Sequence, residues 1–418
     1  MTGCPFNHAA PAEFDLFSPF YLNDPAAVYD NAREKNPVFW YEPLGVWIVT
    51  RRSDVDAILM DWQLWSCKAN GTSIDIPAKY RSVVSSELMS EIMIGMDPPK
   101  HSGARQVAQR GFLKPTIAKL APQIEARAQR ILDTLAQAGE AEFMESYCLE
   151  LTTQTLMALL ALPAEDEALI RQLRDDHFRV LASGREPMVE PELSRVWQRY
   201  TAAQLRLRTL VNERRDSQET DIISIMASAR ETDLTPSLSA ERIAMHLTEF
   251  AAAGTDTTAQ AMANAILFLS AHPEQCAAAL ADPALWPRVF EETVRRRPSA
   301  PFTSRVAARD TEVAGVAIKE GEYVWLSLAS ANTDPSAVDN AMAFDIHRPV
   351  LDEQSHYAFT KGRHTCIGAP LGRLQGAIGL RVAYERLKSL RATPGQPLDF
   401  LPLALLPIRR ALQVQWEL

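Results

Sequence analysis

The sequence predicts one large domain, residues 1–418, that is mostly α-helical with a smaller β portion. Three observations lead to this fold class: helical apolar periodicity from about 103 to 275, short strand-like runs gathered in a few places, and no internal repeat or credible linker. Hydrophobic residues make up 47% of the chain and charged residues 23%, a balance that supports a large buried core. We place the helix-rich core at about 103–297 and 366–390, and the β-rich portions at about 38–50, 304–326 and 401–416.

The first part of the chain predicts a hairpin, a helix and a loop. Residues 38–42 and 45–50 flank a Pro-Leu-Gly break and predict a β-hairpin, which a short helix at 52–60 follows. Residues 66–95 are polar, lack a clear period and contain glycine and proline. This composition indicates a long functional loop rather than part of the core.

Helical periodicity governs the middle of the chain. Apolar residues recur there at three- and four-residue spacing, with breaks near Gly139 and Pro163. The longest predicted helix runs from about 239 to 270 and contains the run AAAGTDTT. The other predicted helices cover 116–138, 142–160, 164–182, 191–214, 220–231 and 283–297.

The last part of the chain predicts short strands around one further helix. Strand-like runs occupy 304–308, 312–318, 322–326, 401–407 and 411–416. Residues 333–363 are largely irregular, and a helix is expected to begin just after Cys366.

Charge and cysteine usage narrow the class of protein. A formal net charge of −9 argues against a nucleic-acid binder that works through bulk electrostatics. The N-terminal run MTGCPFNHAAPAEFDLF lacks a basic region followed by an apolar stretch, and no run of about 18 apolar residues occurs, so we expect neither a signal peptide nor a transmembrane helix. The five cysteines are odd in number and widely spaced, which favours a reduced, cytoplasmic protein over a disulfide or zinc framework.

Cys366 stands out from the other cysteines by its surroundings. It lies in the segment FTKGRHTCIGAP, between Gly362 and Gly368 and just before a helical stretch. Glycines allow backbone turns that bring a chain close to a flat cofactor, and the N–H groups of a following helix favour a thiolate over a thiol. A lone cysteine is usually a small buried apolar residue, and for Cys366 in isolation that reading stays open.

The pattern F-x-x-G-x-H-x-C-x-G resembles the heme-binding loop of cytochrome P450 enzymes. The resemblance implies that the Cys366 thiolate binds the iron of heme b, where a thiolate favours O–O bond cleavage. One departure is visible: Thr360 stands where the family commonly has glycine. The residues of this segment expected to hold the cofactor are Phe359, Gly362, His364, Cys366, Ile367 and Gly368.

The run AAAGTDTT resembles the oxygen-activating motif of the family's central helix. The resemblance implies that Thr257 hydrogen-bonds dioxygen or a water and that Asp256 feeds protons from solvent. Ala253 and Gly254 would leave room for oxygen and permit a local opening of the helix. The alternative is a helix interior whose polar residues bond back to carbonyls.

Three further charged residues match the family's structural set. Glu292 and Arg295 have the spacing of its E-x-x-R pair, which places both on one helix face, and Arg348 fits the third position. The resemblance implies that they brace the region behind the cysteine loop. Taken alone, the pair would be ordinary charge on a solvated helix.

Basic residues provide candidates for the heme propionates and for a partner surface. The resemblance assigns His101, Arg105, Arg305 and His364 to the propionates, which need cationic or hydrogen-bonding partners when buried. A ferredoxin-type electron donor would dock near Arg105, Arg110, Lys114, Arg363 and Arg373, because a basic patch suits an acidic donor. The alternatives are surface or capping roles and scattered solvated charge.

The family's layout also indicates a mostly apolar substrate pocket. Glu249 precedes Ala253 by four residues on the same helix face, where it would meet a basic or hydroxylated substrate, or else point to a water channel or solvent. The expected pocket residues are Glu249, Ala253, Thr257, Phe302, Thr303 and Leu405, with the 66–95 loop as a further wall.

The resemblance covers nearly the whole chain and implies a soluble bacterial monooxygenase. Electrons from NAD(P)H would arrive through a separate ferredoxin and reductase, and one oxygen atom would enter a small, mainly hydrophobic substrate by hydroxylation, O-dealkylation or epoxidation. We expect a monomer that binds neither membrane nor nucleic acid. Two alternatives stay open: a peroxide-using heme-thiolate peroxygenase, and a non-enzymatic heme sensor or carrier. The acid–alcohol pair favours oxygen activation.

Overall fold

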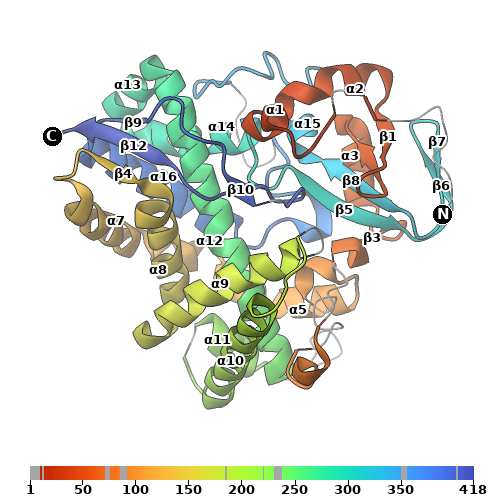
Figure 1. Ribbon diagram of the computed structural model, residues 1–418, viewed down its shortest axis with the longest axis horizontal. Coiled ribbons are helices and arrows are strands. Elements are labelled where there is room, and N and C mark those ends of the chain that lie inside the picture. The colour runs from red at the N-terminus through yellow and green to blue at the C-terminus, as the bar shows by residue number, and fades with distance from the viewer. Residues whose placement is uncertain are drawn as a thin grey trace. The chain divides into compact units, whose positions relative to one another are not determined.

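The described residues of the computed structural model fall into two compact units, drawn in Figure 1. Unit 1 comprises the described residues of 1–70, 263–366 and 391–410, and unit 2 those of 71–262, 367–390 and 411–418. The structure describes residues 10–11, 14–70, 76–84, 92–183, 186–219, 221–229, 238–349, 355–401 and 403–418. Helices predominate, and none that is described is long and apolar enough to cross a membrane.

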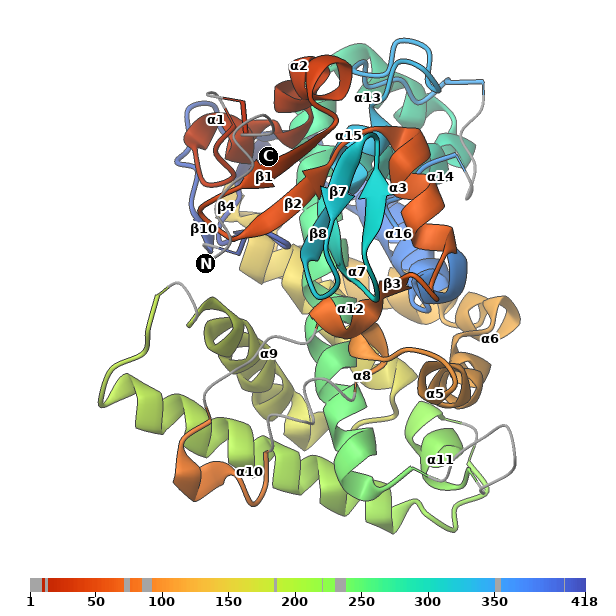
Figure 2. The same cartoon turned by 90° about the vertical axis from the view of Figure 1, so that its right-hand side faces the viewer.

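Unit 1 contains a five-stranded sheet with the order β1-β2-β8-β5-β3 (Figure 2). The predicted hairpin is present: β1 and β2 pair antiparallel with Val38 opposite Val49, and Gly45 turns the chain at a φ of 62°. Strand β2 then pairs parallel with β8. The strands of this sheet are β1 (Val38–Tyr41), β2 (Val46–Val49), β3 (Trp65–Ser66), β5 (Phe302–Ala307) and β8 (Tyr323–Ser327).

Short helices and two small ribbons accompany this sheet in unit 1. Helix α15 starts where β8 ends, because Ser327 caps it by accepting a hydrogen bond from the Ser330 backbone N–H. The helices are α1 (Pro19–Asn23), α2 (Tyr29–Lys35), α3 (Arg52–Met60), α13 (Pro273–Ala281), α14 (Trp286–Arg296) and α15 (Leu328–Asn332). The ribbons pair β6 (Thr311–Val313) with β7 (Val316–Ile318) and β10 (Phe400–Leu401) with β11 (Ile408–Arg409).

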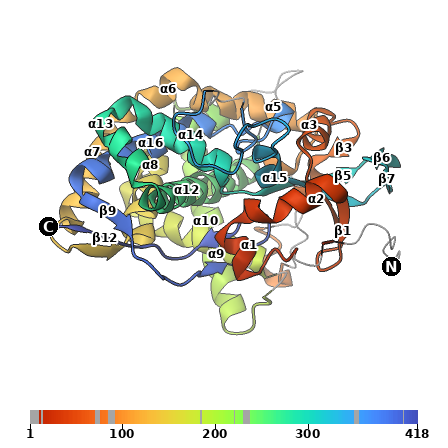
Figure 3. The ribbon, with the colours of Figure 1, turned by 90° about the horizontal axis from the view of Figure 1, so that it is seen from above.

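Unit 2 is built from longer helices. Helix α16 (Ala369–Arg386) packs along α7 and α8, as Figure 3 shows. This packing is close: a Cβ on Gly379 would lie 2.8 Å from side-chain atoms of both Leu151 and Met262. The other helices are α5 (Lys100–Ala108), α6 (Lys114–Ala118), α7 (Ala121–Leu135), α8 (Glu150–Leu159), α9 (Glu167–Ala182), α10 (Glu192–Glu213) and α11 (Ile222–Ala227).

Helix α12 (Ala240–Ala271) is the longest described helix, and the chain passes from unit 2 to unit 1 within it. Its bounds differ by one residue from the predicted 239–270. A three-stranded sheet has the order β4-β12-β9. Its strands are β4 (Glu140–Glu142), β9 (Lys388–Ala392) and β12 (Gln413–Glu417).

Two of the sequence predictions were wrong in detail. The described part of the predicted 66–95 loop is not outside the core, because Ile76, Tyr80 and Met93 are buried in the main apolar cluster of unit 2. Its remaining residues, 71–75 and 85–91, lie outside the described part of the chain. The predicted strand at 401–407 is also absent, since β10 ends at Leu401 and the chain pairs again only at Ile408. The expectation of a single domain stays a prediction.

Three charged side chains form a buried cluster in unit 1. The Arg295 guanidinium donates to both carboxylate oxygens of Glu292 at 2.6 and 2.7 Å, and Arg348 donates to the same carboxylate at 3.2 Å. Glu292 and Arg295 are 0% and 1% exposed. Arg295 also donates to the carbonyls of Asn332 and Ala341 at 3.0 and 2.8 Å, so the cluster links α14 to two chain segments far away in sequence.

Replacing Glu292 by alanine is expected to lower the free energy of unfolding by about 3–5 kcal/mol, because two buried guanidiniums lose their shared carboxylate. The matched Glu312→Ala, at an exposed position of β6, should change it by less than about 0.5 kcal/mol. Urea denaturation followed by far-UV circular dichroism measures both. Equal stability of the two variants would contradict the structural role of the cluster.

Candidate functional site

The cysteine loop presents its thiol outward. Cys366 is exposed, whereas Cys67 and Cys148 are buried. The loop is closed by a hydrogen bond of 2.8 Å from the Cys366 backbone N–H to the Phe359 carbonyl. An exposed cysteine held in an ordered turn does not fit the reading of Cys366 as a small core residue.

The two residues that turn this loop have left-handed backbones. Gly362 has a φ of 72°, and a Cβ there would lie 2.8 Å from the Leu59 carbonyl oxygen, so glycine is required twice over. Thr360 has a φ of 56°, which accounts for glycine being common at this position. Its hydroxyl donates to the His364 carbonyl at 2.7 Å, a bond that glycine could not make and that offsets part of the strain.

Helix α12 has an exposed strip in the predicted oxygen-activating segment. Ala253 is exposed and Gly254 and Thr257 are half-buried, although most described residues of the helix are buried. The helix continues without a break through this segment, so the predicted local opening is not present. The Thr257 hydroxyl donates to the Ala253 carbonyl at 2.6 Å, which is the back-bond expected of threonine in a helix.

Asp256 lies buried on the same helix beside a cation that the sequence did not indicate. The Nε atom of Arg174, on α9, is 3.7 Å from its carboxylate, and the Thr255 hydroxyl donates to it at 3.1 Å. Burial raises the pKa of Asp256 to about 7, and the nearby Arg174 opposes this rise. A carboxyl group with this pKa both accepts and releases a proton near neutral pH.

Arg174 was missed because its position carries no local signal. It belongs to the run RQLRDDHFRV of α9, where charged residues read as ordinary helix surface. Only the tertiary packing of α9 in unit 2 brings it to Asp256.

The predicted propionate ligands are distributed over both units. His101 and the half-buried Arg105 lie on α5 in unit 2, and Arg305 lies on β5 in unit 1 with His364 in the cysteine loop. His101 and Arg305 are buried. Buried donors of this kind suit a group that carries carboxylates, and the outward thiol suits a metal that binds sulfur. The residues present therefore fit a heme.

The remaining predicted site residues divide between surface and core. Arg110 and Lys114 are exposed in unit 2, and Arg363, exposed in unit 1, places its guanidinium 4.9 Å from the ring centroid of Trp62. Phe302, predicted as an aromatic wall, is instead packed in the core of unit 1, 5.6 Å from the Trp325 ring. The others in this group are Thr303, Ile367, Gly368, Arg373 and Leu405, all of which are partly buried.

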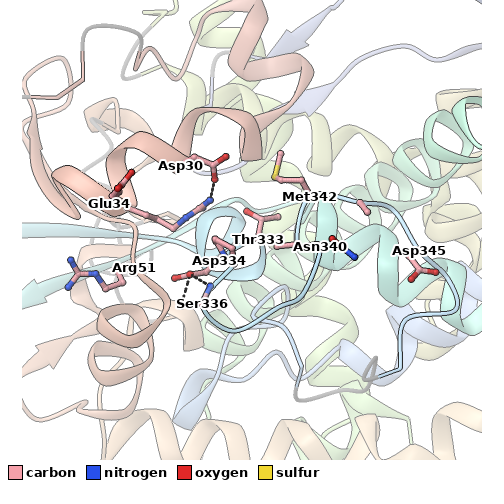
Figure 4. Close-up of a pocket in the computed structure, with 13 residues that line it drawn as sticks. Asp30, Glu34, Arg51, Thr333, Asp334, Ser336, Asn340, Met342 and Asp345 are labelled. Carbon is pink, nitrogen blue, oxygen red and sulfur yellow. Dashed lines mark hydrogen bonds and ion pairs between the residues drawn. The ribbon is translucent and has the colours of Figure 1, made fainter.

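A cavity of 740 Å³ lies within unit 1, away from the predicted site residues in its lining (Figure 4). Asp30 and Glu34 enter it from α2, and Asp334 and Asp345 from the chain after α15. The Asp345 backbone N–H donates to Glu292 at 3.0 Å, which ties the cavity wall to the buried ion cluster. We assign the cavity no part in the chemistry, because no predicted site residue lines it.

Comparison with known proteins confirms the predicted fold class. The profile of the cytochrome P450 family matches residues 90–283 and 276–401. The putative cytochrome P450 YjiB of Bacillus subtilis (strain 168) is 32% identical over 377 residues, which is 88% of this chain and 89% of that protein. The epothilone C/D epoxidase of Sorangium cellulosum is 28% identical over 385 residues, 91% of this chain and 90% of the relative. The structure of cytochrome P450 CYP109Q5 from Chondromyces apiculatus matches with a TM-score of 0.84 at 28% identity, covering 97% of this chain and 98% of that one.

Gly362→Ala is expected to lower the free energy of unfolding by about 2 kcal/mol or more, since it adds both backbone strain and a clash with the Leu59 carbonyl. Gly395→Ala is the matched control, with a φ of 70° and no atom within 4 Å of the added Cβ. It should show the strain alone, about 1 kcal/mol. Chemical denaturation of both variants measures the difference, and equal losses would contradict the close approach at Gly362.

Proposed function

The chain belongs to the cytochrome P450 family and is a heme-iron monooxygenase, and we propose that it transfers one oxygen atom of dioxygen to a small, mainly hydrophobic organic substrate. The observation that carries this proposal is the buried Asp256, with a pKa of about 7, one residue from the half-buried Thr257 on α12. Oxygen activation needs protons delivered to a water-poor site, and such an acid–alcohol pair supplies them. The epoxidase among the relatives supports oxygen transfer as the reaction.

Cys366 is the residue we assign to the iron. Its outward thiol precedes the start of α16 by three residues, and helix N–H groups favour the thiolate. Heme b would be held further by His101, Arg105, Arg305 and His364 through its propionates. When bound, the heme supplies the redox chemistry of oxygen activation.

Proton delivery is the part of the reaction that this chain's own residues perform. In its protonated form Asp256 holds a proton next to the exposed strip of Ala253, Gly254 and Thr257. In its ionised form it pairs with Arg174, which is itself buried. Arg174 therefore favours the state that has given up its proton, and neutral pH lies close to the balance of the two.

Electrons are proposed to come from NAD(P)H through a separate ferredoxin-type protein in the cytoplasm. The exposed Arg110, Lys114 and Arg363 provide positive charge on a chain whose net charge is −9. Complementary charge raises the association rate of an acidic donor. The family's use of separate redox proteins agrees with this arrangement.

Cys366→Ala should abolish the strongly red-shifted Soret band that a thiolate-bound heme gives in the reduced, carbon monoxide-bound state, and with it monooxygenase activity. Cys276→Ala, a half-buried cysteine on α13, should keep both. A difference spectrum of each purified variant decides the matter. An unchanged spectrum in Cys366→Ala would mean that another residue binds the iron.

Asp256→Asn and Thr257→Ala should uncouple NAD(P)H consumption from product formation, with hydrogen peroxide released instead. In the unaltered enzyme, coupled turnover should fall as the pH rises through about 7, because the proton-bearing form of Asp256 is lost; in Asp256→Asn this dependence should disappear. Asp310→Asn, an exposed surface change, is the control. Peroxide-driven turnover as fast as the ferredoxin-supported reaction would instead indicate a peroxygenase.

A further inference from the structure

His246 and Glu249 form a polar pair inside unit 2 that the proton pathway does not use. His246 is 0% exposed, and neither of its ring nitrogens has a hydrogen-bond partner among the described residues. The Oε2 atom of Glu249 is likewise buried without a partner, in a side chain that is 15% exposed. The two groups are 3.6 Å apart, from Nδ1 to Oε2, which is too long for a hydrogen bond.

The surroundings of this pair are apolar. The His246 ring lies nearly parallel to that of Phe250, with centroids 6.5 Å apart, and Phe250 packs edge-on against Phe112 at 5.5 Å. Among the described residues, His246 alone lies within ion-pair distance of Glu249. A carboxylate in such a place is costly unless a partner with donors or positive charge joins it. The unmet hydrogen bonds therefore point to a ligand.

The pair shares a helix face with the exposed strip. Positions 246, 249, 253 and 257 follow one another at three- and four-residue steps along α12, which places them on one side of it. At about 1.5 Å per residue, Glu249 lies roughly 6 Å along the helix from Ala253 and roughly 12 Å from Thr257. A single elongated molecule can therefore meet the pair at one end and the exposed strip at the other.

We propose that His246 and Glu249 form a subsite for the protonated amine of an otherwise apolar substrate. This rests on the proposed function, which makes the strip at Ala253 the place of oxidation. An ammonium group supplies both the N–H donors and the positive charge that the Glu249 carboxylate lacks, whereas a hydroxyl group would leave the charge uncompensated. His246 accepts a second N–H and fixes the direction of the amine. Oxygen then enters the substrate about 6–12 Å from its nitrogen.

The test compares two chains of equal length, N,N-dimethyloctylamine and 1-octanol, as ligands of the heme-loaded enzyme. Isothermal titration calorimetry gives both dissociation constants, and the Soret band reports whether the amine binds the iron directly. The unaltered enzyme should bind the amine at least about 10-fold more tightly than the alcohol. Glu249→Gln should weaken amine binding by about 10- to 100-fold and leave the alcohol within about 3-fold.

Glu241→Gln provides the matched control, because Glu241 is an exposed carboxylate on the same helix. It should change neither dissociation constant. Equal binding of amine and alcohol, an amine preference that survives Glu249→Gln, or direct ligation of the iron by the amine would each overturn the subsite.

The carbon monoxide spectrum of the same preparations separates this result from the proposed function. A thiolate-heme band together with no amine preference refutes the subsite alone, and loss of that band in the unaltered protein refutes the proposed function. An intact band in Glu249→Gln shows that the variant is folded, so a lost amine preference then supports the subsite.

Discussion

The carboxylate of Glu292, held between two buried guanidiniums, is the interaction on which the cysteine loop depends. Arg295 extends from it to the Asn332 carbonyl, and the Asn332 side chain accepts the Tyr357 backbone N–H at 2.6 Å. The Tyr357 hydroxyl donates to Asp56 at 2.7 Å, on the helix whose end packs against Gly362. A continuous series of polar contacts thus runs from α14 to the loop that carries Cys366. An ion cluster of this kind adds little net stability, but it specifies one backbone path.

Helix α12 applies a related principle within an apolar setting. Threonines along it satisfy their own hydroxyls by bonding back one turn, as Thr248 does to Ala244 and Thr255 to Ala251. The ionisable side chains have no such local solution. Asp256 obtains Arg174 from another helix, and the pair at His246 obtains nothing from the described chain. Polar groups that the helix cannot satisfy itself therefore mark the functional positions.

Much of this arrangement was predictable from sequence, and the reason lies in how local each feature is. The hairpin at Val38 and the bounds of α12 follow from periodicity within a short window. The cysteine loop was found by its spacing, and the Thr360 backbone explains why glycine is usual there. Strand β4 could not be found, because its residues Glu140–Glu142 carry no alternation and become a strand only by pairing with β12. The Arg174–Asp256 contact escaped for the same reason, since 82 positions separate its partners.

Unit 2 is discontinuous, and this has a consequence for how the chain is made. Its main segment ends at Met262, but α16 and β12 arrive only after residues 367–390 and 411–418 have been synthesised. At about 5–20 residues per second, the segment up to Met262 waits roughly 5 to 20 s for Ile367. During that interval the surface of α8 around Leu151, which Gly379 later covers at van der Waals distance or closer, has no helix on it. The nascent chain is therefore most exposed to aggregation and to chaperone binding late in translation.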